Sequence, residues 1–297
     1  MTGVQTCALP IYVAMNKKLA KARDLKSRVR EVLDTFAAGS RKLVNQTDPD
    51  CAIIRGVQGS HAGYNVQSVV DDKHGLIVNT DAVSDTNDLN QFARQIEQAN
   101  EILGKSCDVA CADAGYADTD ELEKIDVQGI KVIVPSQRQA LHKEEDPFSK
   151  SRFVYDKDQD SYICPEGNRL YYQGTDKSTG NRHYMITDKH LCFSCKHYGV
   201  CTSSKKGRKI NRLPNEEVKQ KLEEQYQESG SQEIYARRKT RSEHPFGHIK
   251  RNLKTDSFLL RGRDGVQAET SLLGTCFNVA RMITIFGVST LIERLIN

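Results

Sequence analysis

The sequence lacks three features that would point to common classes of protein. No apolar run is long enough to span a membrane, since the best candidate, residues 272–286, is short and contains Asn278 and Arg281. There is no Gly-rich loop of the kind that cradles phosphates. No Ser or Cys stands in the sequence context of a nucleophile elbow. We therefore expect neither a membrane span nor covalent nucleophilic catalysis.

The composition is that of a soluble globular protein. Apolar residues make up 38% and charged residues 28% of the 297 residues, which allows one large domain or two modest ones. We find no signal-peptide pattern and expect a cytoplasmic location. The net charge of +4 is mild, but Lys and Arg gather in the last third of the chain. Such local clustering says more about a nucleic-acid partner than the total charge does.

Acidic residues are nearly absent from the most basic segment, residues 235–254. It holds seven Lys or Arg and one carboxylate, Glu243. Lys and Arg that contact phosphates release condensed counterions, so the segment suits a nucleic acid. A lone carboxylate is repelled there unless a cation intervenes, and Mg²⁺ is commonly held by one or two carboxylates plus a phosphate. Taken alone, the segment still favours a solvated basic helix whose Glu makes surface pairs.

Hydrophobic periodicity indicates an α/β chain. The expected order is a packing helix, a hairpin, a helix, a strand and a second strand, at residues 13–36, 64–80, 89–103, 108–113 and 131–134. The helix of residues 89–103 has its N-cap signal at residues 85–88 and its C-cap signal at Gly104. The first of the two later strands ends in Asp113, which is where open α/β sheets place functional groups.

Two further segments have simple interpretations. Residues 47–63 contain Pro and several Gly and read as a loop. Residues 265–296 are apolar around most of their circumference and predict one helix packed in the core.

Four cysteines lie close together in a polar, Lys-rich region. Cys192 and Cys195 form a Cys-x-x-Cys pair, Cys201 follows, and Cys164 precedes them in a Cys-Pro-x-Gly turn. Four thiolates suit a tetrahedral structural Zn²⁺ with no open catalytic position. A histidine in place of one cysteine is an alternative ligand, with His183, His190 and His197 as candidates. Four unrelated free thiols are the other alternative.

Taken together and in this order, these motifs resemble DDE transposases of bacterial insertion sequences, closest to the branch with a cysteine-rich insertion. The resemblance extends from about residue 13 to the end. It rests on Gly-Tyr-Asn-Val-Gln at residues 63–67, Ala-Asp-Ala-Gly-Tyr at residues 112–116, the four cysteines, and Glu-His-Pro-Phe-Gly-His-Ile-Lys at residues 243–250. It implies DNA transposition by an RNase H-like domain whose mixed sheet, with flanking helices, is interrupted by a zinc-ribbon-like insertion.

In this family three acids bind two Mg²⁺ ions, and the resemblance assigns two of them here. Asp113 matches the second acid and Glu243 the third, while Lys250 matches a base that holds DNA phosphate. Tyr235 and Arg238 match the associated signature, although four residues separate Arg238 from Glu243 where three are usual. Two arginines complete the expected DNA-binding set: Arg241 and Arg251. Seven residues make nearly two helical turns, so Glu243 and Lys250 should share a face, with the helix starting or bending near Pro245.

The first acid of the family has no counterpart in the sequence. Asp71 and Asp72 lie at a hairpin turn, and no apolar strand ends in Asp within residues 12–46. Residues 2–11 match the translation of a common sequencing adapter, so we expect residues 1–11 to be non-native and the chain to be an N-terminally truncated, inactive fragment. The expected parts are residues 1–11, 12–46 (helical), 47–138 (first part of the RNase H-like domain), 139–215 (cysteine-rich insertion) and 216–297 (helical completion).

The resemblance implies DNA as partner, both transposon ends and target, with no membrane and a nucleoid-associated location. Whether a homodimer assembles on the DNA stays open. Two other functions remain: a DNA-binding zinc module whose acids are incidental, and another RNase H-like nuclease or resolvase. The binding module should hold DNA equally well with a chelator present, whereas the transposase should respond to Mg²⁺.

Overall fold

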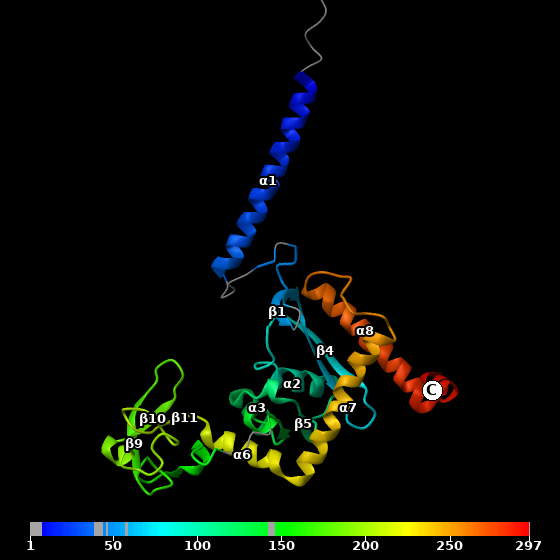
Figure 1. Ribbon diagram of the computed structural model, residues 1–297. Coiled ribbons are helices and arrows are strands. Elements are labelled where there is room, and N and C mark those ends of the chain that lie inside the picture. Colours follow the sequence, from blue (N-terminus) through cyan, green and yellow to red (C-terminus); the bar gives the residue numbers. More distant parts are fainter. Residues whose placement is uncertain (1–7, 39–43, 46, 57–58, 142–145, 297) are drawn as a thin grey trace, which may run out of the picture. The chain divides into compact units, whose positions relative to one another are not determined.

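The computed structural model describes residues 8–38, 44–45, 47–56, 59–141 and 146–296 (Figure 1). The chain divides into two compact units, one formed by residues 1–106 and 237–297 and the other by residues 107–236. Helix α7 (Ser229–Arg251) contributes residues to both. The mixture of helices and strands confirms the expected α/β class. The strands form four separate sheets within the described residues.

In the first unit, an antiparallel hairpin lies between two helices. β3 (Asn65–Val70) pairs with β4 (Ile77–Val83), and α2 (Phe92–Leu103) and α8 (Arg263–Phe286) both pack against β4. This confirms the predicted hairpin and helix. Asp71 closes the hairpin turn by accepting hydrogen bonds from the amides of His74 at 2.8 Å and Leu76 at 2.6 Å.

Side chains of α8 bind the open edge of β4. Asn278 accepts from the amide of Ile77 and donates to its carbonyl, both at 2.8 Å. Gln267 accepts from the amide of Ala82 at 2.7 Å and donates to the carbonyl of Thr80 at 2.8 Å. Buried backbone groups need partners, so these side chains replace a neighbouring strand and cover an edge that would otherwise attract one.

Two predictions for the first unit are wrong. Residues 47–63 include a second hairpin, β1 (Ala52–Gly56) with β2 (Gly59–Gly63), so cross-strand pairing overrides the loop composition. The N-cap of α2 is Gln91, without a side-chain cap bond. The polar residues expected to cap it bind elsewhere: Asp85 accepts from Gln91, and Asp88 accepts from Asn65 and Gln67.

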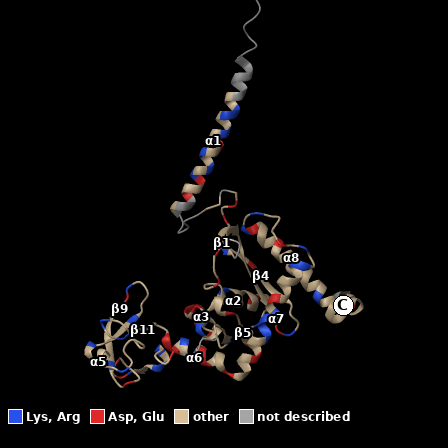
Figure 2. Cartoon of the chain, viewed as in Figure 1, with Lys and Arg blue, Asp and Glu red and all other residues tan. Residues whose placement is uncertain are grey.

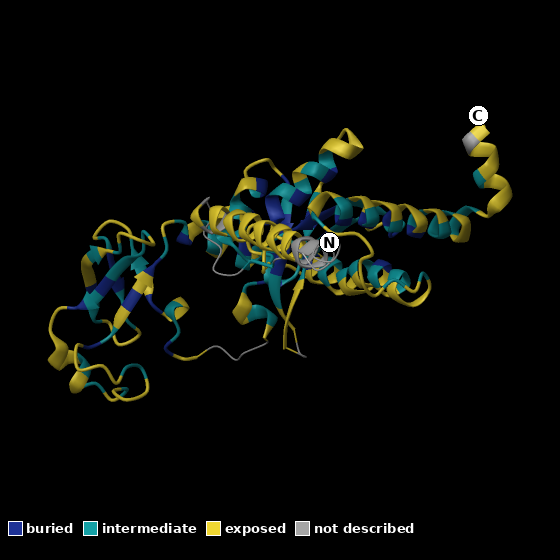
Figure 3. Ribbon diagram, turned by 90° about the horizontal axis from the view of Figure 1, so that it is seen from above, coloured by how far each residue is buried: buried dark blue, intermediate teal, exposed yellow. Residues whose placement is uncertain are grey.

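The terminal helices also differ from expectation. α1 (Ala8–Ala38) is a helix, but residues 15–34 show no buried position, so it is not the expected packing helix (Figure 3). The segment predicted as one final helix forms two helices, α8 and α9 (Val288–Ile296). Gly287, with φ 74°, lies between them. Only one face of α8 is buried, since Leu272 is 64% exposed. Among the described residues no single helix is long and apolar enough to cross a membrane, although the bent pair α8–α9 passes that test jointly.

The second unit contains a two-stranded parallel sheet and a five-stranded antiparallel sheet. β5 (Val109–Cys111) pairs with β6 (Lys131–Ile133), and α3 (Thr119–Asp126) and α6 (Glu216–Gln227) pack against β6. Asp118 caps α3 by accepting hydrogen bonds from the amides of Asp120 and Glu121. Three short helical turns complete this unit outside the sheets and longer helices: η1 (Ala114–Tyr116), α4 (Gln137–Ala140) and η2 (Lys150–Arg152).

The five-stranded sheet has the order β11-β10-β9-β8-β7. The strands are β7 (Val154–Asp156), β8 (Ser161–Ile163), β9 (Arg169–Thr175), β10 (Arg182–Ile186) and β11 (Lys209–Arg212), with α5 (Lys189–Phe193) after β10. Its core consists of Phe153, Tyr162, Leu170, Tyr184, Ile186 and Ile210. The sequence signalled this region only through its cysteines, because its strands are short and polar.

Candidate functional site

Asp113 lies directly beyond the C-terminal end of β5. Ala110 of that strand is buried, at 2% exposure, whereas Asp113 is half-buried. The carboxylate caps η1 by accepting a hydrogen bond from the amide of Gly115 at 2.8 Å. The strand fixes the backbone and the cap orients the side chain, so Asp113 is a positioned acid at a strand end, as the sequence predicts.

Glu243 and Lys250 lie on the exposed side of α7. Both residues are exposed and both are within the continuous helix, so their seven-residue spacing places them on one face. Lys239, one turn before Glu243, is exposed as well. Lys and Arg occur along this helix in Figure 2. The face therefore presents one carboxylate between cations, which is the arrangement that the sequence predicts.

Pro245 does not mark a helix start. α7 begins at Ser229, and Pro245 is inside it and fully buried. Of the two expected alternatives, a helix start near residues 241–244 is therefore wrong, and a bend at Pro245 stays a prediction. The rings of His244 and His248 contact Phe277 of α8, with centroids 5.7 and 5.4 Å apart. These ring contacts pack α7 against α8, and Glu243 stays exposed.

The other predicted DNA-binding residues are distributed over both units. Arg241 lies 3.7 Å from Asp72, an exposed surface pair that constrains it weakly. Arg251 is exposed near the end of α7, and Arg238 is half-buried. Tyr235 belongs to the second unit, where its ring lies 5.1 Å from that of Tyr226.

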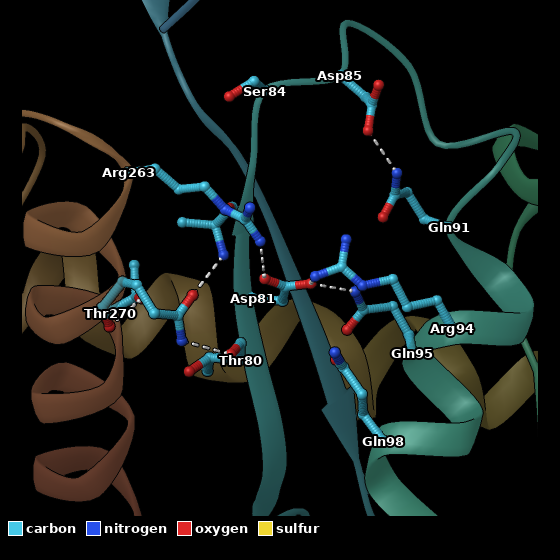
Figure 4. A network of polar contacts seen from close by, with 12 residues as sticks. Thr80, Asp81, Ser84, Asp85, Gln91, Arg94, Gln95, Gln98, Arg263 and Thr270 are labelled. Carbon is cyan, nitrogen blue, oxygen red and sulfur yellow. Dashed lines mark hydrogen bonds and ion pairs between the residues drawn. The ribbon is translucent and has the colours of Figure 1, made fainter. Parts of the chain in front are cut away.

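A buried carboxylate in the first unit escaped the sequence analysis. Asp81 is 6% exposed and accepts from Gln95 at 2.9 Å (Figure 4). Arg94 lies 2.6 Å and Arg263 3.9 Å from its oxygens, so two cations compensate its charge. Because these partners come from α2 and α8, Asp81 ties both helices to β4. Successive side chains of a strand point to opposite faces, so the position of Asp81 in β4 could have indicated an acid that faces inward. The sequence does not indicate which residues compensate its charge.

Three of the four predicted zinc ligands lie against the core of the five-stranded sheet. Cys164, Cys192 and Cys201 pack against that core. Burial raises the pKa of the Cys201 thiol; nearby Arg208 lowers it, and the thiols of Cys192, Cys164 and Cys195 raise it. Backbone amides point at two sulfurs: that of Arg208 at Cys192 Sγ and that of His197 at Cys195 Sγ, both at 3.5 Å.

No metal centre is assembled among the described residues. No group of three or more His, Cys, Asp or Glu side chains in that part of the chain is placed to hold an ion. Of the two acids, Asp113 lies in the second unit and Glu243 in the first. The cysteines are close neighbours, but their geometry is not that of a formed site.

Comparison with known proteins finds one family that part of the chain is similar to. The family model described as the transposase DDE domain matches residues 163–283. The match agrees with the resemblance to DDE transposases for that segment. It includes the four cysteines, Glu243 and Lys250, while Asp113 lies outside it. No curated protein and no solved structure matches the chain.

Proposed function

We propose that this chain is part of the catalytic domain of a bacterial insertion-sequence transposase. Its reaction is phosphodiester hydrolysis and transesterification at transposon ends and target DNA, in an RNase H-like domain interrupted by the cysteine-rich region. The observation that carries the proposal is Glu243 beside Lys250 on an exposed basic helix face, inside the segment that matches the family.

The proposed site uses acids to bind metal and cations to bind DNA. Asp113 and Glu243 supply carboxylate oxygens, the ligands that the hard cation Mg²⁺ prefers. When bound, a pair of such ions stabilises the attacking and leaving oxygens of an in-line displacement. Lys250 and Arg251, both exposed, hold the DNA backbone by contact with phosphates. The Gly115 amide keeps the Asp113 carboxylate oriented before metal and DNA arrive.

The chain alone is proposed to be inactive in cleavage. Two of the three acids of the family have counterparts here, and both metal ions depend on shared ligands, so one missing carboxylate weakens the pair. Metal-dependent nicking of plasmid DNA by the purified chain, abolished in Glu243→Gln, would overturn this part of the proposal.

Binding measured with and without Mg²⁺ tests the function. Without metal, the Glu243 carboxylate repels the DNA phosphates, whereas a bound Mg²⁺ bridges the two. One pair of unit charges at contact distance in water interacts by about 1 kcal/mol, which corresponds to a roughly fivefold change in affinity. We expect Mg²⁺ to tighten duplex binding by the unmodified chain, at constant ionic strength. Glu243→Gln should bind more tightly in chelator and lose the Mg²⁺ response.

A matched control separates this effect from general screening. Glu233→Gln removes an exposed acid from the same helix and should keep the Mg²⁺ response. If all three proteins bind equally with and without Mg²⁺, the DNA-binding zinc module becomes the better account.

We also propose a structural Zn²⁺ bound by Cys164, Cys192, Cys195 and Cys201. Support comes from Cys164, Cys192 and Cys201 packing against one core, from the influence of the Cys195 thiol on Cys201, and from the amides directed at two sulfurs, which favour thiolates. We expect one Zn²⁺ per purified chain, released by thiol modification, and both zinc and thermal stability lost in Cys195→Ser. Cys276→Ser, at an exposed cysteine elsewhere, should change neither. A zinc-free chain with full stability contradicts the proposal.

A further inference from the structure

The region around α5 is the longest stretch of unopposed positive charge in the chain. Residues 189–215 contain seven Lys or Arg and no Asp or Glu. The net charge of this segment, +7, exceeds the +4 of the whole chain. A field of this sign on a folded surface favours a polyanionic partner.

Four apolar side chains project from the same segment. Leu191 is 44%, Phe193 37%, Tyr198 38% and Val200 72% exposed, and we call this set the knuckle patch. The rings of Phe193 and Tyr198 meet edge to face with centroids 5.3 Å apart, so α5 and the following loop present one surface. Exposed aromatic and aliphatic groups of this kind usually mark a contact surface.

The loop beneath the knuckle patch is held by its own backbone. The amide of Val200 donates to the His197 carbonyl at 3.1 Å, and that of Gly199 donates to the Thr202 carbonyl at 3.0 Å. Gly199 has φ 90°, which a residue with a Cβ rarely adopts. The apolar side chains are therefore presented in a fixed arrangement, which lowers the entropy that binding must overcome.

Lysines surround the knuckle patch in sequence and are open to solvent. Lys189, Lys205, Lys206 and Lys209 are exposed, and none forms an ion pair within the described part of the chain. Lys196 differs, since it lies 3.3 Å from Glu166. The two arginines of the segment serve the fold: Arg208 donates to the carbonyls of Cys201 and Phe148, and Arg212 donates to Tyr162. The lysines are thus the cations available to a partner.

We propose that the knuckle patch and its lysines form a second DNA-contact surface, separate from α7, that binds duplex DNA. The lysines contact phosphates, and the apolar side chains lie against sugars and base edges in a groove, as the wedges of minor-groove binders do. An acid-free, lysine-rich segment matches the charge of a DNA backbone. The inference rests on the proposed function for its choice of DNA.

Salt-dependent binding of the full chain to a 30-base-pair duplex tests this surface. The double variant Lys205→Gln/Lys206→Gln should bind more weakly, and its slope of log affinity against log salt should fall by about one for each lysine removed. Val200→Ser should weaken binding about fourfold per methylene lost from the contact, with the salt slope unchanged. Val200 is the most exposed member of the patch, so the substitution leaves the fold intact.

The control is Lys157→Gln/Lys177→Gln, two exposed lysines of the same sheet region outside the segment, which should bind like the unmodified chain. Unchanged binding by the test variants, with loss in Lys250→Gln, overturns this inference and leaves the proposed function standing. An unmodified chain that fails to bind any duplex overturns both. Variants that lose binding only to vesicles containing anionic lipid, and keep DNA binding, assign the surface to a membrane and overturn the inference.

Discussion

At the residue scale, the functional proposal depends on Glu243, an exposed acid in a basic segment. It is exposed on α7, whereas the buried Asp81 is compensated by two arginines and a glutamine. A compensated buried acid serves the fold. An exposed acid in a basic field is costly for DNA binding unless a cation accompanies it. Asp81 therefore stabilises the fold, whereas Glu243 is proposed to bind a metal ion.

Asp176 provides a residue-scale prediction about pH. Its carboxylate accepts from the hydroxyl and amide of Ser178 and from the amide of Thr179, and these bonds, the Ser178 hydroxyl first, lower its pKa from 3.8 to about 2. Because the pKa is lower in the folded state, the ionised Asp176 stabilises the turn at pH values above the unfolded-state pKa. This stabilisation is lost as the pH falls from about 4 to about 2. We expect the amide signals of this turn to shift in that window by nuclear magnetic resonance.

Asp176→Asn supplies the comparison, because it keeps an acceptor oxygen and removes the titration. Its turn signals should be independent of pH between about 4 and 2. A transition in the unmodified chain centred at the ordinary carboxyl pKa would show that the turn bonds do not favour the ionised form.

At the element scale, α8 replaces a neighbouring strand along β4. Asn278 and Gln267 each make two hydrogen bonds to β4 backbone groups. Removing either side chain leaves partly buried backbone groups unpaired, at about 1–3 kcal/mol for each group that stays unpaired. We expect Asn278→Ala and Gln267→Ala to lower the free energy of unfolding by at least about 1 kcal/mol in urea denaturation.

Leu272→Ala is the control on the outer face of α8. Leu272 is 64% exposed, so its truncation should change the unfolding free energy by less than about 0.5 kcal/mol. Destabilisation by Leu272→Ala equal to that of Asn278→Ala would show that α8 is held by its outer face instead.

The elements that could be predicted from the sequence are those whose signal is local. The hairpin at Asp71, the Gly104 terminus of α2 and the strand before Asp113 follow from turn chemistry, a glycine at positive φ and an apolar run. The exposure of α1 could not be predicted, since an amphipathic pattern does not say whether a partner is present. The edge contacts of Asn278 depend on residues about 200 positions away, and no local pattern encodes them.

The candidate site was predictable in part for the same reason. The shared face of Glu243 and Lys250 follows from helix geometry alone. The start of α7 at Ser229 does not, because a buried Pro245 is tolerated through tertiary packing against α8. The five-stranded sheet went unrecognised because its core depends on single Tyr and Leu residues spread over short strands.

At the scale of the whole molecule, the two basic surfaces both lie in the segment that matches the transposase family. Residues 189–215 and the exposed face of α7 are within residues 163–283. The mild net charge of +4 conceals this concentration, because the remaining residues are on balance acidic. DNA contacts are therefore expected in both units, since residues 189–215 belong to the second and Lys250 to the first.

We propose that Asp113 and Glu243 each bind divalent metal in the DNA-bound chain, and metal-directed cleavage of the protein tests this proposal. Fe²⁺ in place of Mg²⁺, with ascorbate and peroxide, cuts the polypeptide beside its ligands, and mass spectrometry locates the cuts. We expect cuts near both residue 113 and residue 243 in the DNA-bound chain, both reduced by excess Mg²⁺, with those near residue 243 lost in Glu243→Gln. Cuts at neither position, or cuts near residue 243 that persist undiminished in Glu243→Gln, would contradict the proposal.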